Sequence, residues 1–491
     1  MRNKIIDFFA KRIILLAGIA LLRPFALISC GGKNISKPNI LWIIAEDLSP
    51  DIGCYGNSSV NTPVLDALAR SGVRYNNVFT TAPVCTPSRT ALALGMYQTS
   101  VNAHHQRYPE ELKNKLPENV LPMNEILRRN GYQTANISEK PGTGKTDWSF
   151  KSEFSGYDHS AWDELSPNQP FFAVVNLRLT HRPFERDTVN PIDPGRVSLP
   201  TYYPDHIVAR KDWAEYLESV QLMDREVQMV LDKVKEKGYA DNTVIFFFGD
   251  HGRPFTRAKT FLYDSGLKIP LIIVCPENLT WHEYLPKTTV NDQLISAIDI
   301  TATTLSMAGI PKPGNMQGRV MFGPDKEPPA KYIYSAMDRM GEIFFRSRTV
   351  RSDRFRYIRN FHNGFSVNAA STANWKATNP IFHLIDVLGE RNQLDSVQRK
   401  MVLPLPQEEL YDIQKDPEEL VNLAADSDYA QELVQLRRQL ETWQKDVKDY
   451  GMMEDSPELK KYFFDYGNES AALNSPAANK LRQDVLSELN K

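Results

Sequence analysis

Residues 39–47, NILWIIAED, contain the pattern that decides the fold. The apolar run that ends at Ala45 is typical of a strand buried on both faces of a parallel sheet. Lys37-Pro38 comes just before the run, and the acidic pair Glu46-Asp47 comes directly after it. The stretch therefore predicts a buried strand that places two carboxylates at its C-terminal end.

The same pattern returns along the chain and alternates with helical segments. Two segments with helical periodicity, 64–72 and 123–131, each end in glycine, a common helix terminator. Further apolar strands are expected at 133–138, 170–177, 242–250 and 270–276. This alternation predicts an α/β domain whose large, mostly parallel sheet is flanked by helices. In such sheets, ligands bind at the C-terminal ends of the strands.

Shifts in composition divide the chain into several parts. The expected parts are a signal peptide in residues 1–29, a catalytic α/β domain in 37–330, a smaller α+β subdomain in 331–450 and a polar tail in 451–491. The segment from Gly314 to Pro329 is rich in proline, glycine and charge, which is typical of a linker or a long surface loop. This segment sets the boundary between the catalytic domain and the subdomain.

The N-terminus has the features of an export signal. Basic residues open the chain, an apolar run follows, and Leu27-Ile28-Ser29-Cys30 resembles a bacterial lipobox. Cleavage before Cys30 would leave this cysteine to carry a lipid anchor to the membrane. This predicts an exported bacterial lipoprotein, periplasmic or associated with the outer membrane. A short uncleaved anchor helix is the alternative.

Charge and cysteine content exclude some classes of protein. The net charge of −2, from 58 basic and 60 acidic residues, gives no general attraction for polyanions, so no nucleic-acid partner is expected. Apart from Cys30 the chain has Cys54, Cys85 and Cys275, an odd number that does not suggest a disulfide framework. Cys85 therefore needs a different explanation.

Cys85 lies in the stretch APVCTPSRTALALG, residues 82–95. A small buried thiol ahead of a helix that starts near Pro87 would be the ordinary explanation. Residues 85–95, however, match C-x-P-S-R-x-x-L-x-x-G, which is too specific to expect by chance in one chain. This pattern resembles the signature of the type I sulfatases of the alkaline phosphatase superfamily.

The resemblance implies that a separate maturation enzyme oxidises Cys85 to formylglycine. The hydrate of this aldehyde carries two geminal hydroxyls, of which one attacks sulfur and the other later expels sulfate, an exit that serine or unmodified cysteine lacks. A helix N-terminus after Pro87 would add N–H groups and a favourable dipole for the anion. Arg89 takes the family's role of fixing the hydrate.

The resemblance also implies a divalent metal ion. The family's first metal pair, Asp-Asp, is matched by Glu46-Asp47, and its second, usually Asp-Asn, is matched by Asp250-His251. Oxygen ligands suit Ca²⁺. A histidine also admits Mn²⁺ or Zn²⁺, and it occurs in formylglycine phosphonate and phosphodiester hydrolases of the same superfamily. A plain turn from strand to loop is the alternative explanation for Asp250 and His251.

Further side chains take roles from the same resemblance. His181, which follows the strand at 170–177, is the expected acid that protonates the leaving group. Lys259 is expected to contact the sulfate and Lys145 the formylglycine, with Lys140 as the alternative to Lys145. Arg257 and Tyr263, as neighbours of Lys259, are also expected to contact substrate. His105 is expected to do so because it follows the signature helix shortly, and an ordinary surface position is the alternative for His105 and Arg257.

The resemblance covers nearly the whole chain after the signal peptide. Residues 409–424, ELYDIQKDPEELVNLA, match a C-terminal segment of the family, and residues 249–272 are most similar to its heparan N-sulfatase-like branch. A sulfatase that releases O- or N-linked sulfate from a sulfated carbohydrate is therefore predicted. Two alternatives stay open: a phosphodiester or phosphonate monoester hydrolase of the same superfamily, and a non-catalytic lipoprotein that binds sulfated glycans and never matures Cys85.

Overall fold

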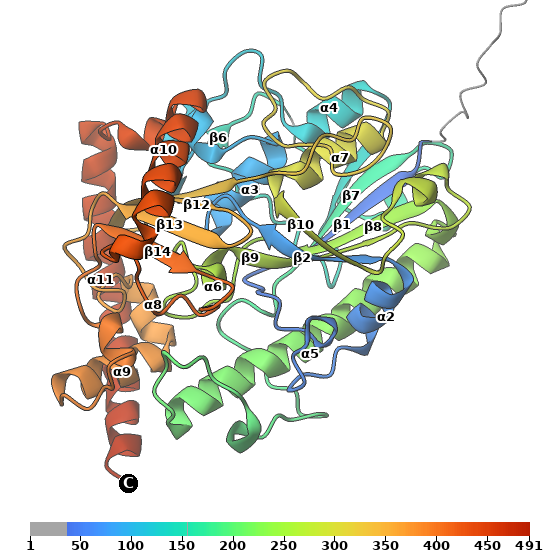
Figure 1. Cartoon of the computed structure of the whole chain (residues 1–491). Helices are drawn as coiled ribbons and strands as arrows, with labels where there is room; N and C mark the ends of the chain where they lie inside the picture. The colour runs from blue at the N-terminus through green and yellow to red at the C-terminus, as the bar shows by residue number, and fades with distance from the viewer. Residues whose placement is uncertain (1–36, 155) are drawn as a thin grey trace, which may run out of the picture. The chain divides into compact units, whose positions relative to one another are not determined.

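A seven-stranded sheet forms the centre of the computed structural model, which describes residues 37–154 and 156–491 (Figure 1). Across the sheet the strands are β10 (Val290–Ser296), β2 (Val73–Phe79), β9 (Lys268–Val274), β8 (Thr243–Gly249), β1 (Asn39–Ala45), β7 (Phe171–Leu177) and β5 (Gln133–Ile137). Only β9 runs antiparallel to its neighbours within this sheet. The predicted large, mostly parallel sheet is confirmed. The predicted signal peptide and Cys30 lie outside the described residues.

The central strands are apolar because both faces of the sheet are covered. Every residue of β1 is buried, and Trp42 in its middle packs edge-on against Phe172 of β7 and Phe248 of β8, at 5.2 and 5.3 Å between ring centres. Such aromatic pairs add to the burial of apolar area. The polar residues that follow β1 and β8 are thereby fixed to a rigid edge.

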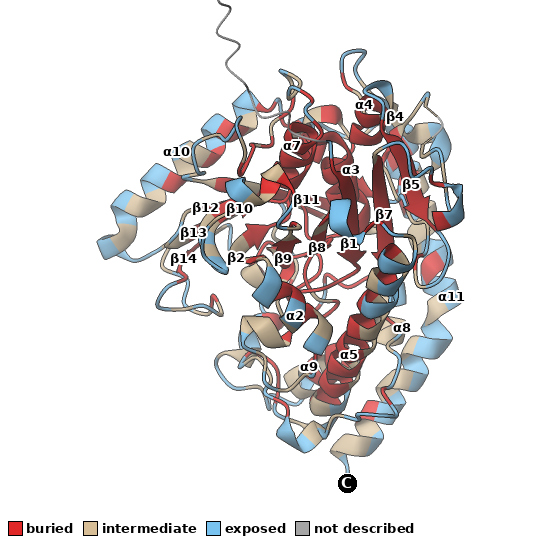
Figure 2. Ribbon diagram, turned by 90° about the vertical axis from the view of Figure 1, so that its right-hand side faces the viewer, coloured by how far each residue is buried: buried red, intermediate tan, exposed pale blue. Residues whose placement is uncertain are grey.

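Helices cover the two faces in separate groups (Figures 1 and 2). One face carries α2 (Pro63–Ser71) and the long α5 (Ile207–Glu236). The other carries α3 (Cys85–Leu94), α4 (Met123–Arg129) and α7 (Ile298–Met307). Figure 2 shows α3 and α7 as almost wholly buried helices, so the segment that begins at Cys85 belongs to the core of the molecule.

A second sheet of five strands takes four of them from the C-terminal part of the chain. In order, its strands are β14 (Glu408–Asp412), β13 (Phe355–Asn360), β12 (Ile343–Arg351), β11 (Ile333–Met340) and β3 (His105–Gln106). Helix α10 (Ala430–Asp446) packs on β12 and β13, in agreement with an α+β arrangement. The edge strand β3 comes from the N-terminal half of the chain, and residues 37–491 form one compact unit. The two parts expected from the sequence are therefore joined through a shared sheet.

Residues 451–491, expected to be a polar tail, contain the helix α11 (Pro457–Leu489). Ser456 caps it by accepting a hydrogen bond from the N–H of Leu459, and the helix packs on α8 (Ala373–Thr378) and α9 (Pro380–Glu390). Few of its residues are buried, which is why its sequence looks like a tail. The remaining short elements are β4 (Asn114–Lys115), β6 (Phe150–Lys151) and α6 (Asp264–Leu267). No helix within the described residues is long and apolar enough to cross a membrane.

Candidate active site

The C-terminal ends of β1 and β8 bring two acidic segments together. Ala45 pairs with Gly249 in the parallel register, so that Asp47 and Asp250 lie side by side just beyond the sheet. Asp250 Oδ1 accepts hydrogen bonds from the backbone N–H groups of Asp47 and His251, both at 2.9 Å. The predicted convergence of the strand ends is thus present, and one carboxylate fixes both turns.

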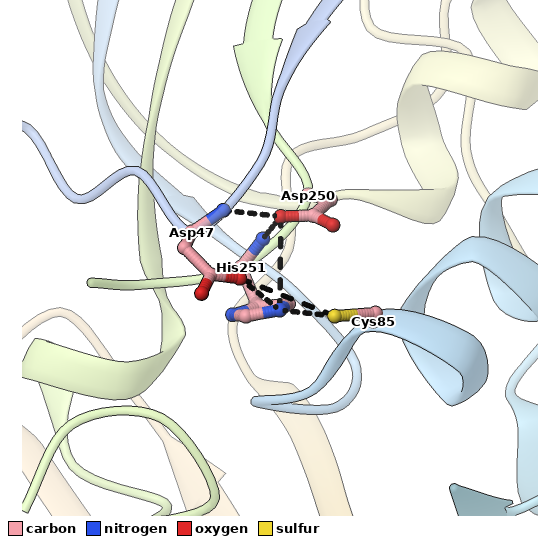
Figure 3. Close-up of side chains that lie close together, drawn as sticks. All are labelled: Asp47, Cys85, Asp250 and His251. Atoms are coloured by element: carbon pink, nitrogen blue, oxygen red, sulfur yellow. Dashed lines mark hydrogen bonds and ion pairs between the residues drawn. The ribbon is translucent and has the colours of Figure 1, made fainter. Parts of the chain in front are cut away.

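Cys85 lies at the start of α3 and faces this pair (Figure 3). Its Sγ is 3.2 Å from Nε2 of His251 and 4.0 Å from Oδ1 of Asp47. Ser88, one turn further along the helix, donates a hydrogen bond from Oγ to the carbonyl oxygen of Asp250 at 2.6 Å. This bond attaches the helix to the end of β8, which gives the signature serine a structural role.

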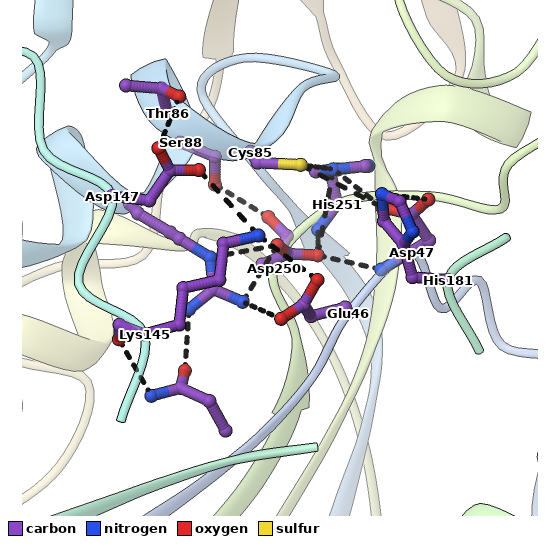
Figure 4. Close-up of polar contacts among 12 residues, drawn as sticks. Glu46, Asp47, Cys85, Thr86, Ser88, Lys145, Asp147, His181, Asp250 and His251 are labelled. Atoms are coloured by element: carbon purple, nitrogen blue, oxygen red, sulfur yellow. Dashed lines mark hydrogen bonds and ion pairs between the residues drawn. The ribbon is translucent and has the colours of Figure 1, made fainter. Parts of the chain in front are cut away.

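Three buried or half-buried cations neutralise the acidic group, and Lys145 is the one labelled in Figure 4. Lys259 Nζ lies 2.8 Å from Oδ2 of Asp47, and Arg89 Nη2 lies 3.0 Å from Oδ2 of Asp250. The third pair joins Lys145 Nζ and Glu46 Oε2 at 3.0 Å, while Lys140 is exposed. Each carboxylate therefore has its own cation, as buried charges require.

The charges around the site shift the ionisation of its groups. Burial alone would raise the pKa of Asp47, but Lys259, His181 and His251 outweigh burial and hold it well below its usual range. Burial likewise opposes the charge on His251, yet the carboxylates of Asp250 and Asp47 raise its pKa to about 10. The arrangement therefore keeps the carboxylates ionised in the interior of the protein.

Hydrogen bonds from Nδ1 fix the ring orientation of the two histidines at the site. Nδ1 of His251 donates a hydrogen bond to the carbonyl of Gly252 at 2.9 Å, so Nε2 faces the carboxylates and Cys85. Nδ1 of His181 donates to the carbonyl of Arg182 at 2.6 Å, and its Nε2 lies 3.9 Å from Oδ2 of Asp47. His181 is about one-third exposed, so its imidazole lies where the site meets solvent.

Comparison with known proteins identifies the family. Residues 38–310 match the family model of the sulfatases. The chain belongs to the sulfatase family. An ulvan-active sulfatase of Formosa agariphila is 32% identical over 482 residues, which cover 87% of this chain and 78% of the relative. As a member of this family, the protein is a sulfuric ester hydrolase.

One further curated relative and one solved structure are also similar to the sulfatase. Human N-sulphoglucosamine sulphohydrolase is 26% identical over 492 residues, covering 86% of this chain and 93% of its own. The solved structure of a phosphonate monoester hydrolase from Silicibacter pomeroyi aligns with a TM-score of 0.59 at 17% identity, over 86% of this chain and 98% of its own. That last similarity shows the fold alone, so the fold does not distinguish sulfate from phosphonate esters.

Four side chains of the sulfatase could bind a divalent cation. Ligand atoms of Asp47, Cys85, Asp250 and His251 lie within 4.8 Å of one another and are all buried. Two carboxylates and a histidine with its Nε2 turned inward are a donor set that divalent metal ions accept. Glu46, expected in this set, lies beside it and bonds to Lys145 instead. The residues present therefore fit a metal ion, and Glu46 lies next to this group without belonging to it.

Three predicted substrate residues do not lie in this group. His105 is buried, and its Nε2 is 2.7 Å from Oδ1 of Asp455. The guanidinium of Arg257 stacks on the ring of Tyr263, 3.9 Å from its centre, and donates to the carbonyl of Glu419 at 2.6 Å. These three side chains are buried in contacts with the C-terminal part of the chain, which places them in support of the site.

Arg257 also lines a separate cavity of about 930 Å³. Asp51, Arg253 and Lys268 are among its other lining residues, and none of the side chains that surround Cys85 takes part in it. Arg253 pairs with Asp51 at 3.1 Å, so part of the charge in this cavity is already neutralised. The group around Cys85 lies elsewhere, and its side chains Lys145 and His181 are partly exposed.

Two supporting residues were missed in the sequence. Asn176 accepts a hydrogen bond from Nη1 of Arg89 at 2.5 Å, and its presence in an otherwise apolar strand is a signal that could have been noticed. Gln106 accepts a hydrogen bond from the N–H of Thr86 at 2.9 Å. Nothing in the sequence around Gln106 marks it, because the contact depends on the pairing of β3 with the C-terminal sheet.

Proposed function

We propose that this sulfatase removes O- or N-linked sulfate from a sulfated carbohydrate. The curated relatives support this class of substrate, since one is named for activity on ulvan and another for N-sulphoglucosamine. The observation that carries the proposal is the position of Cys85, at the start of α3 and within 3.2 Å of His251 in a group of paired acids and cations. This is where a nucleophile for an anionic ester is needed.

The proposal includes maturation of Cys85 to formylglycine by a separate enzyme. The aldehyde hydrate would supply two hydroxyls on one carbon, one for attack on sulfur and one for release of sulfate. Arg89 and Lys145 lie on the side of Asp250 and Glu46, where they would orient the nucleophile and balance its charge. Lys259 would bind a sulfate oxygen, and His181, half-exposed at the rim, would pass a proton to the leaving group.

We further propose a divalent metal ion on Asp47, Asp250 and His251, with Glu46 placed behind them. The ion would supply positive charge at the sulfuryl oxygens and would acidify the nucleophile. Ca²⁺ suits the carboxylates, and the imidazole of His251 also suits Mn²⁺ or Zn²⁺. Because His251 has a raised pKa in this setting, binding of the ion would compete with a proton and should weaken as the pH falls.

The first experiment is the mass of the peptide that contains Cys85, from protein made in its own host. Conversion of the thiol to the aldehyde lowers the mass by about 18 Da, and this is the expected result. Replacement Cys85→Ala should lower sulfate release by on the order of 10³-fold or more while the protein stays folded. An unmodified thiol together with tight glycan binding would instead support the non-catalytic lipoprotein.

A phosphonate monoester or phosphodiester hydrolase is the second candidate. The imidazole of His251, 3.1 Å from Asp47 Oδ1, is the observation that favours it, because this nitrogen donor departs from the usual sulfatase pair. Rates on an aryl sulfate and on the matching aryl phosphonate decide between the two. We expect the sulfate to be preferred, and a preference for the phosphonate would reverse the assignment.

A further inference from the structure

Arg107 differs from the other cations around Cys85 in having no acidic partner. Lys145, Lys259 and Arg89 each pair with a carboxylate. Arg107 is exposed, and among residues 37–154 and 156–491 its guanidinium bonds only to the phenol oxygen of Tyr466, with 3.2 Å between Nη1 and Oη. A free guanidinium beside an anion-processing site is available for a second anionic group.

The backbone brings Arg107 to the entrance of the active site. Its neighbour Gln106 accepts the N–H of Thr86, the residue after Cys85, at 2.9 Å. Consecutive Cα atoms are about 3.8 Å apart, so the backbone of Arg107 lies directly next to the residue that makes this contact. Partial covering of its guanidinium would lower the pKa of Arg107, but Tyr466 and then the nearby charge of Asp147 raise it above its ordinary value, so an acidic side chain that bonds to Thr86 lies within electrostatic reach.

Aromatic side chains continue this rim from Arg107 to Lys259. A Cβ placed on Gly341 would lie 3.0 Å from Cε1 of Tyr466 and 3.7 Å from Cγ2 of Thr372, so these residues are packed together. Thr372, Trp375 and Met340 then line one small pocket with Lys259. Tyr466 of α11, together with Thr372 and Trp375 at the start of α8, therefore forms a series of neighbouring side chains between Arg107 and the lysine proposed to bind sulfate.

Trp375 and Tyr466 are suited to contact a sugar. Both side chains are partly exposed. The indole of Trp375 packs on no other aromatic ring in the described part of the chain, whereas Tyr466 stacks on Tyr462 with 6.2 Å between ring centres. An aromatic face that is half-buried and unstacked offers apolar area to a ligand at low cost in conformational entropy. Trp375 lines the same pocket as Lys259, and Tyr466 bonds to Arg107, so each aromatic side chain lies near a cation. This combination fits a sugar ring that carries acidic substituents.

We propose that Arg107, Tyr466 and Trp375 form a subsite for a further anionic group on the saccharide, either a uronate carboxylate or a second sulfate. Arg107 pairs with the anion, and the two aromatic side chains contact the sugar ring. This inference rests on the proposed function, because it concerns the sugar that carries the sulfate to be released. It makes the preferred substrate a saccharide with at least two negative charges.

The test uses two matched pairs of substrates and the variant Arg107→Gln. One pair is a sulfated disaccharide with a uronate and the same compound with its carboxyl group reduced; the other is a disulfated and a monosulfated glucosamine. Wild-type protein should prefer the more highly charged member of at least one pair by about tenfold in kcat/KM, through KM, and Arg107→Gln should abolish that preference. The pair in which the preference is lost identifies the group as carboxylate or sulfate.

Two further variants separate recognition from folding. Arg438→Gln removes an equal charge from the exposed face of α10 and should keep the wild-type preference. Trp375→Ala should raise KM for both members of a pair and leave their ratio unchanged. A preference that survives Arg107→Gln, or an equal loss of rate on both members, overturns the subsite.

Failure of the proposed function would be visible separately. If wild-type protein releases no sulfate from any of the four compounds, the same ratios are measured as Kd by calorimetry, because the contact of Arg107 with the anion precedes any chemistry. A tenfold ratio of Kd that disappears in Arg107→Gln would then support the subsite and refute the catalytic proposal alone. Equal Kd values for wild type and variant on all four compounds would overturn the subsite.

Discussion

At the scale of single residues, His251 is the nitrogen donor in a group otherwise made of carboxylates and Cys85. Its Nε2 lies 3.1 Å from Asp47 and 3.2 Å from Cys85, and a hydrogen bond from Nδ1 to Gly252 fixes the ring. A carboxylate and carbonyl site favours Ca²⁺, whereas each nitrogen donor favours later transition metals. His251 should therefore determine which ion the site prefers.

Replacement of His251 tests this role. His251→Asn exchanges the nitrogen donor for an amide oxygen, so we expect Zn²⁺ affinity to fall by about tenfold or more and Ca²⁺ affinity to change much less. Both are measured by competition with a chromophoric chelator at one pH. His362→Asn is the matched control, since that imidazole is exposed and bonds only to the carbonyl of Phe344. An equal loss for both ions would show that His251 is not a ligand.

The active-site residues differ in how far the sequence could predict them. Glu46, Asp47, Asp250 and His251 directly follow buried strands, and local patterns predict both the strands and their parallel order. Arg257 is different because its partner Glu419 is 162 residues away in the chain. No local pattern records such a contact, so the sequence could not show that Arg257 bonds to the C-terminal part of the chain.

At the scale of elements, α11 shows the same limit. Its sequence is polar because one narrow stripe, which includes Leu459, Phe463 and Val485, is all that it buries. Its N-terminal end is attached through Asp455, whose Oδ1 lies 2.7 Å from His105 of β3 and whose Oδ2 lies 3.1 Å from Arg339 of β11. The helix, whose sequence looks like a tail, is thereby attached to β3. Gln106 of this strand accepts a hydrogen bond from the start of α3.

This attachment predicts a defined pH dependence. Burial would raise the pKa of Asp455, but His105 and Arg339 hold it well below its usual range. A carboxyl group with a depressed folded pKa stabilises the protein above its unfolded pKa of about 3.9 and loses that contribution as the pH falls further. Asp455→Asn should therefore lower the free energy of unfolding by about 1–3 kcal/mol, uniformly from pH 8 to 5, with the gap narrowing only below about pH 4.

Urea unfolding of wild type and Asp455→Asn across that pH range measures the difference. Asp465→Asn serves as the control, because the side chain of Asp465 is about half exposed on the same helix and pairs, within the described residues, only with Lys461. We expect it to cost less than about 0.5 kcal/mol at every pH. A gap for Asp455→Asn that changed between pH 6 and 8 would mean that His105, rather than Asp455, controls the attachment.

At the scale of the whole molecule, the active site depends on both halves of the chain. The strand ends and α3 carry Cys85 and the charged side chains around it, while β3, which contacts α3, pairs with β11 of the C-terminal sheet. Residues 37–491 accordingly form one compact unit. A lipid anchor at Cys30 would join this unit to a membrane from outside it, so anchoring and catalysis should be separable.

Replacement of Cys30 tests that separation. Wild-type protein in its bacterial host should incorporate labelled palmitate and sediment with membranes, because the lipobox-like Leu27-Ile28-Ser29-Cys30 follows a basic start and an apolar run. Cys30→Ser should lose both label and sedimentation, yet its rate of sulfate release should equal that of the detergent-solubilised wild type. Cys54→Ser, which removes a free, half-buried cysteine within the compact unit, should keep the label. The anchor would be excluded if Cys30→Ser kept the label or if wild-type protein were found only in the soluble fraction. A large loss of activity in Cys30→Ser would mean that the N-terminal segment contributes to the catalytic unit.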